Sequence, residues 1–173
     1  MAQARAAPGP LQAGGRRDAL TQIPSYRENN RLEAKLATGG LPHSLWETYS
    51  AFANSYGGVI LLGVEELPDH SLRVQGLLEP HEMADELWSM LSDPKVVSAN
   101  ILQREDVQVL NAGDDQIVAI FVPRAPARLR PVYIGQDPYG GTYFRMGEGD
   151  CRAQRHEVLA MLQDQENIRK KET

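Results

Sequence analysis

The sequence has a single cysteine, Cys151, among its 173 residues. One cysteine cannot build an internal disulfide framework or a cysteine-rich zinc site, and this scarcity is typical of a reducing compartment. No apolar run approaches the roughly 18 residues that a membrane-spanning helix needs. The N-terminal segment also lacks the apolar core of a secretory signal. We therefore expect a cytoplasmic protein without a membrane span.

Several catalytic and cofactor signatures are missing as well. The sequence contains no Gly-x-x-x-x-Gly-Lys-Ser/Thr loop for nucleotide phosphates and no Gly-x-Ser-x-Gly turn for a serine nucleophile. Its four histidines are scattered, and no two have the spacing of a zinc pair on one helix. These absences exclude the phosphate-loop and serine-hydrolase classes, and we expect no resident cofactor.

The charge is unevenly distributed along the chain. The formal net charge is −5, which is unlike a strongly basic nucleic-acid binder. Residues 64–115, however, hold twelve acidic and three basic side chains, whereas residues 124–155 hold six arginines and three acids. Arginine presents a planar fork of donors that suits phosphate. Any phosphate contacts are therefore expected mainly in the C-terminal half.

Hydrophobic periodicity predicts alternating strands and helices. Leu32, Ala34 and Leu36 alternate with polar residues, which predicts a half-buried strand over residues 31–36. A helix is predicted after Pro42, with one apolar face at spacings of three and four, made of Leu45, Tyr49, Phe52 and Tyr56. The apolar run 59–64 predicts a strand buried on both faces.

The remaining pattern completes an α+β domain. Further elements are predicted as a hairpin partner at 71–78, a helix at 80–92, strands at 101–104, 107–111 and 117–122, a strand pair at 131–135 and 142–146, and a helix from about 153. We expect one domain over residues 23–166, a mixed β-sheet flanked by helices. Residues 1–22 are predicted to be a disordered arm and 167–173 a polar tail, with further domains following in the native chain.

Three segments carry a joint signature. They are ENNRLEAK at 28–35, AFANSYGGVILLGVEE at 51–66, and RPVY at 130–133 followed by GTYFRMG at 141–147. In this order they closely resemble the Schlafen/Alba-like DNA-binding domain family, over about residues 25–165. The family also appears in bacterial transcriptional regulators and helicase-related proteins. The resemblance implies a mixed sheet flanked by helices and a role in nucleic-acid binding.

The resulting prediction is a module that binds DNA or RNA without catalysis, at the N-terminus of a bacterial transcriptional regulator. The predicted phosphate contacts are Arg31, Lys35, Arg124, Arg128, Arg130, Arg145, Arg152 and Arg155. We also expect a homodimer, because two-lobed relatives form a clamp from paired lobes and two-fold association is the commonest oligomeric state.

Two alternatives remain open. The resemblance implies a metal-dependent endonuclease if two glutamates and one later acid converge on Mg²⁺ or Mn²⁺. The catalytic set would then be Glu28, Glu33, Lys35 and Glu65 or Glu66, with Glu28, Glu33 and Glu66 as metal ligands. Spacing alone does not bring Glu28 beside Glu33, and basic neighbours on the same strand face could neutralise the acids instead. The second alternative is an oligomerisation or protein-interaction module, which the negative net charge favours.

Overall fold

A four-stranded sheet forms the centre of the molecule. The structure, a computed structural model, describes residues 16–172, with all side chains except those of residues 16–19 and 28. The strand order is β1-β2-β6-β5, with bounds Leu32–Lys35, Gly58–Leu62, Asp115–Val122 and Val107–Ala112. The β1–β2 pair is parallel and the other two pairs are antiparallel. The predicted α+β class with a mixed sheet is confirmed.

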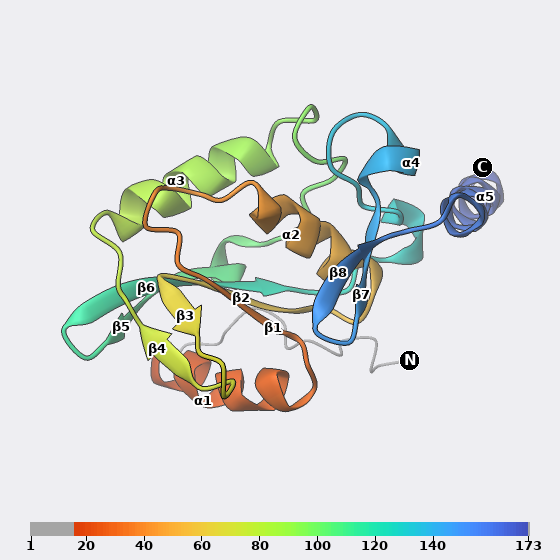
Figure 1. Cartoon of the computed structure of the whole chain (residues 1–173). Coiled ribbons are helices and arrows are strands. Elements are labelled where there is room, and N and C mark those ends of the chain that lie inside the picture. The colour runs from red at the N-terminus through yellow and green to blue at the C-terminus, as the bar shows by residue number, and fades with distance from the viewer. Residues whose placement is uncertain (1–15, 173) are drawn as a thin grey trace.

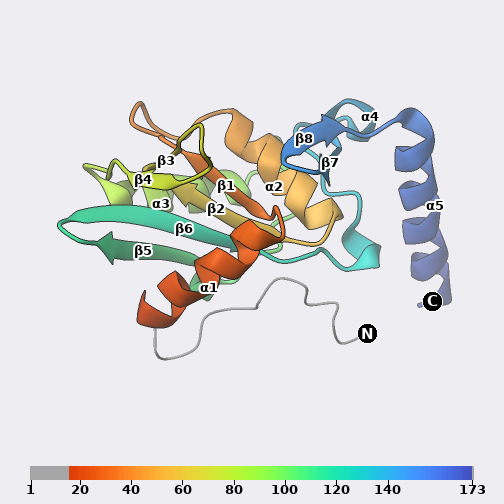
Figure 2. The same cartoon turned by 60° about the horizontal axis from the view of Figure 1, so that its bottom comes forward.

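Helices cover both faces of this sheet, as Figures 1 and 2 show. Helix α2 (Ser44–Asn54) connects the parallel strands β1 and β2, which a tight turn could not join. It lies with α3 (Pro80–Leu91) on one face, and α1 (Arg16–Glu28) lies on the other. Within residues 16–172, no helix is both long and apolar enough to cross a membrane.

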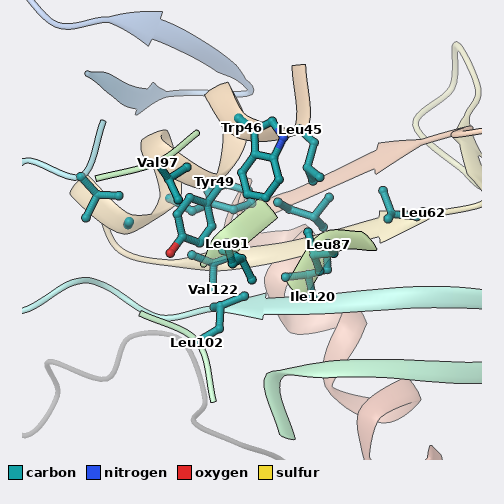
Figure 3. Close-up of a cluster of buried hydrophobic side chains, with 14 of the residues drawn as sticks. Leu45, Trp46, Tyr49, Leu62, Leu87, Leu91, Val97, Leu102, Ile120 and Val122 are labelled. Atoms are coloured by element: carbon teal, nitrogen blue, oxygen red, sulfur yellow. The ribbon is translucent and has the colours of Figure 1, made fainter. Parts of the chain in front are cut away.

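Strand β2 is buried along its whole length. Ile60 and Leu62 face the cluster under α2 and α3, part of which Figure 3 shows. Val59 and Leu61 belong to the opposite cluster, with Tyr26 of α1. Because successive side chains of a strand point to opposite faces, a continuous apolar run is what a strand between two helical layers needs. The prediction of burial on both faces is confirmed.

Two small hairpins flank the sheet. Strand β3 (Val64–Glu66) pairs with β4 (Leu72–Val74), and β7 (Tyr143–Met146) pairs with β8 (Gly149–Arg152). The predicted strand 59–64 is divided, because Gly63 has a φ of +91° and turns the chain out of the main sheet. The predicted pairing of 131–135 with 142–146 is confirmed only as a single antiparallel bridge between Tyr133 and Thr142, and the strand partner of β7 is β8.

Helix α1 includes residues of the N-terminal segment that were predicted to be disordered. Residues 16–22 were predicted to be part of a disordered arm, but they are helical. Ile23 and Tyr26 follow Leu20 at a helical spacing and pack against the sheet, a short pattern that Pro24 obscures in the sequence. Residues 1–15 of the predicted arm lie outside the described residues.

Two other predicted segments differ from the structure. Residues 101–104 form no strand, because side-chain oxygens of Asn100 and Asp106 accept the amide N–H groups of Leu102 and Gln103. At the C-terminal end, helix α5 (Arg155–Lys171) continues through most of the predicted polar tail. A short helix, α4 (Pro138–Gly141), precedes β7.

The Gly57-Gly58 pair makes the turn from α2 into β2. Gly57 has a φ of +79°, which glycine adopts without the steric penalty of a side chain. Gly58 is needed for space: a Cβ there would lie 2.8 Å from both the Arg31 carbonyl oxygen and the Phe52 ring. The two glycines therefore serve different purposes, and together they bring the end of α2 close to the start of β1.

Candidate nucleic-acid interface

A compact ionic network joins β1 to the β7–β8 hairpin. The Glu33 carboxylate contacts Arg145 Nη2 at 3.0 Å and Lys35 Nζ at 3.5 Å, and Asp150 accepts Arg145 Nη1 at 2.7 Å. Lys35 also donates to the Ser44 hydroxyl at 3.0 Å. The Arg145 side chain is 6% exposed and that of Lys35 11%. Two cations and two anions balance, so this network holds the hairpin against β1.

Asn54 connects the second sequence motif to the third. Its Nδ2 donates to the carbonyl oxygens of Val132 and Tyr143 at 2.8 and 3.0 Å, and its Oδ1 accepts the Val132 N–H at 2.8 Å. The Ser50 hydroxyl donates to the same Val132 carbonyl and accepts the Tyr143 N–H. The backbone groups that Asn54 bonds therefore come from segments far along the chain.

Tyr56 lies outside the core. Its spacing predicts a place on the buried face of the helix, and this prediction is wrong. Helix α2 ends at Asn54, whose side chain turns toward Val132, and Tyr56 is 64% exposed. Its backbone is nevertheless fixed. The Gly57 N–H donates to the Phe52 carbonyl at 2.8 Å, and Arg31 Nη1 donates to the Tyr56 carbonyl at 3.1 Å. An exposed aromatic ring is thus held on an ordered turn.

Two of the predicted arginines, Arg31 and Arg124, contact Tyr56, and a third, Arg130, lies near Arg124. The Arg124 guanidinium lies over the Tyr56 ring at 5.4 Å, and Arg31 lies over the Tyr26 ring at 5.4 Å. Arg130 donates to the Ala125 carbonyl at 2.8 Å, and its pKa is lowered first by burial and then by the nearby charge of Arg124. We call Arg31, Tyr56, Arg124 and Arg130 the Tyr56 surface. Among the described residues, none of its arginines forms a salt bridge, although the charge of Asp164 partly opposes the lowering of the Arg130 pKa.

The other predicted arginines have different surroundings. Arg128 is exposed in the same loop as Arg124 and Arg130. Arg152 and Arg155 are exposed and lie over the rings of Tyr143 and Tyr139 at 5.9 and 4.3 Å. Lys35 and Arg145 differ from these, because they are buried in the ionic network and present little charge to solvent.

The predicted carboxylates do not converge in the part of the chain that the structure describes. Glu65 pairs with Arg73, and Glu66 contacts His70 Nδ1 at 3.0 Å. The described groups that could share a metal ion are Glu66, His70 and Glu148, all exposed, and Glu33 is not among them. Glu28 ends α1, and its side chain is not described. The described members of the metal set do not fit one ion, and the endonuclease remains a prediction.

Sequence reasoning missed several residues of this region. Tyr56 was hidden because its spacing continues the apolar face of α2, although the Gly-Gly pair directly after it signalled a turn. Asp150 and Thr48, which share a hydrogen bond of 2.5 Å beside Arg145, lie 102 residues apart. No local pattern indicates a contact of that separation.

The fold and these contacts define an α+β domain in which three separated motifs meet at one end of the sheet. The chain belongs to the Schlafen, AlbA_2 family, whose model matches residues 28–154. No curated protein matches it at a significant level.

Two solved structures are similar to this domain. One is the N-terminal domain of a RecG-related protein from Nitrosomonas europaea, whose name refers to an ATP-dependent DNA helicase. It has 27% identity and a TM-score of 0.54, and the match covers 79% of this chain and 91% of that one. The other is the DIP2311 protein from Corynebacterium diphtheriae, with 16% identity and a TM-score of 0.53, covering 88% of this chain and 29% of that one. The second likeness concerns the fold alone.

Proposed function

We propose that this domain binds nucleic acid through the Tyr56 surface and the adjacent Arg128. The observation that carries the proposal is that neither the arginines of this surface nor Arg128 form a salt bridge among the described residues, in a protein whose net charge is −5. Phosphate contacts supply most of the affinity in such complexes and need uncompensated cations. The family and the name of the Nitrosomonas relative support the same function. A role in a transcriptional regulator and the presence of further domains remain predictions from the resemblance.

The test is the salt dependence of binding to labelled RNA and DNA, measured by fluorescence anisotropy from about 50 to 200 mM salt. Wild-type affinity should fall linearly on a log–log plot. The double variant Arg124→Glu/Arg128→Glu should bind at least tenfold more weakly, with a slope shallower by about 1.4 to 1.8 for two lost phosphate contacts. Both side chains are exposed, so the fold should be retained.

The matched control is Lys95→Glu/Arg104→Glu, which changes the net charge equally but lies in the acidic half of the chain. This control should keep the wild-type slope. Equal losses of affinity in both variants would show that net charge alone governs binding. That result would contradict the assignment of binding to the Tyr56 surface. Absence of any wild-type binding at low salt would overturn the function itself.

A further inference from the structure

A pocket of about 430 Å³ opens beside Tyr56. Its lining includes Asn29, Asn30, Arg31, Tyr56, Gly57 and Arg145, and no carboxylate side chain lines it among the described residues. The volume lies in the range of small-ligand sites. Arginine, amide and aromatic groups on one concave surface are the partners that a phosphate and a nucleobase require.

The Tyr56 ring is prepared for stacking. Arg124 lies over the ring at 5.4 Å, and Tyr56 is still 64% exposed, so ring surface remains open to solvent for a second aromatic group. Because the backbone on both sides is hydrogen-bonded, little additional order is lost when a second ring packs on it. Stacking on such a platform tolerates any base, since every base has a flat aromatic face.

Arg31 is the cation of the pocket that is available to a phosphate. It donates one N–H to the Tyr56 carbonyl and forms no salt bridge among the described residues, so its charge is not neutralised. Arg145 also lines the pocket, but Glu33 and Asp150 already compensate its charge. The guanidinium fork suits phosphate oxygens better than a point charge does.

We propose that this pocket binds one unpaired nucleotide of a single strand, with the base stacked on the exposed ring of Tyr56 and its phosphate held by Arg31. This inference rests on the proposed function and narrows its substrate class. In a duplex both faces of each base are covered by neighbouring bases, so Tyr56 can contribute to single-stranded partners but not to intact duplexes.

The experiment compares Tyr56→Ala with the wild type on single-stranded RNA and DNA of about 12 nucleotides and on a duplex of the same sequence. Loss of one stacked base should weaken single-strand binding by about five- to 150-fold and leave duplex binding unchanged. Tyr56→Phe should restore single-strand binding, because the ring remains. Arg31→Gln should lower the single-strand salt slope by about 0.7.

Leu78→Ala is the matched control, since Leu78 is 98% exposed and lies in the β4–α3 loop away from this pocket. It should bind both substrates as the wild type does, and Tyr56→Ala, Tyr56→Phe and Leu78→Ala should melt near the wild-type temperature. Wild-type single-strand affinity in Tyr56→Ala would overturn the nucleotide pocket while leaving the proposed function intact. If the wild type binds no nucleic acid, the proposed function fails as well.

Discussion

Arg145 holds the β7–β8 hairpin against β1 through its charge. The sequence favours it as a phosphate contact, but its side chain lies between Glu33 and Asp150 and over the Phe52 ring at 5.0 Å. Removing one member of a buried ion pair leaves its partners charged and poorly hydrated, which is far more costly than losing a surface pair.

We therefore predict that Arg145→Met lowers the free energy of unfolding by about 3 kcal/mol, because Asp150 loses its cation in a site where it is 14% exposed. The control Arg73→Met removes the exposed pair with Glu65 and should cost less than about 1 kcal/mol. Urea denaturation of both variants measures the difference. Similar losses would contradict the assignment of a structural role to Arg145.

The Glu33–Lys35 pair could be predicted from the sequence, because residues two apart on a strand share a face. The contact from Glu33 to Arg145 could not, since it depends on how the C-terminal hairpin docks. At this scale the sequence predicts which side chains are polar neighbours along one element. It does not predict which cation from another element compensates the charge of an acidic side chain such as Glu33.

At the scale of elements, the residue at which a helix ends decides whether the next apolar side chain is buried or exposed. Tyr56 continues the apolar spacing of α2, yet the helix ends two residues earlier and the ring points to solvent. The central strands β2 and β6 follow their apolar patterns closely, because burial between two helical layers imposes those patterns. The β7–β8 hairpin has no such pattern, since it lies at the periphery and its residues are largely half-buried or exposed.

The turns of the two small hairpins meet at His70. Its Nδ1 lies 3.0 Å from Glu66 and 3.7 Å from Glu148 in the β7–β8 turn. The hydrogen bond to Glu66, followed by the charge of Glu148, raises the pKa of His70 above its usual value of 6.5, and Arg27 opposes this weakly. Because the folded-state pKa is the higher one, the stabilising contact is complete below about pH 6.5 and is lost as the pH rises through the raised pKa.

We predict that the His70 ring titrates above pH 6.5 in NMR spectra, and that Glu66→Gln lowers its midpoint more than Glu148→Gln does. The melting temperature of His70→Gln should fall further below that of the wild type at about pH 5.5 than at about pH 8.5. A His70 midpoint at its usual value would contradict a contact between the two turns that depends on protonation of His70.

Over the whole molecule, charge is sorted to opposite ends of β6. Glu79, Glu82, Glu86 and Asp115 line a pocket of about 520 Å³ where β6 begins, and Arg124 of the Tyr56 surface follows two residues after β6 ends. A net charge of −5 therefore coexists with a local basic surface. Composition could predict the separation of charge along the chain, but only the topology shows that the two regions lie at different ends.

We predict that two copies associate into a homodimer, because the family resemblance implies paired lobes and two-fold assembly is the commonest. Light scattering should give twice the 19.2 kDa mass of one chain. A mass of one chain over a wide concentration range would contradict this expectation, without bearing on nucleic-acid binding by the monomer.

The hydrogen bonds of Asn54 span 78 and 89 residues of chain. Closing a loop of that size costs roughly 1.8 kcal/mol more chain entropy than closing one of about 10 residues. We therefore predict that the Asn54 contacts form late in folding, after the local hairpin of β5 and β6. A variant that weakens them would leave the folding rate nearly unchanged and accelerate unfolding. The signature by which this family is identified would then govern how long the native state persists, rather than how quickly it is reached.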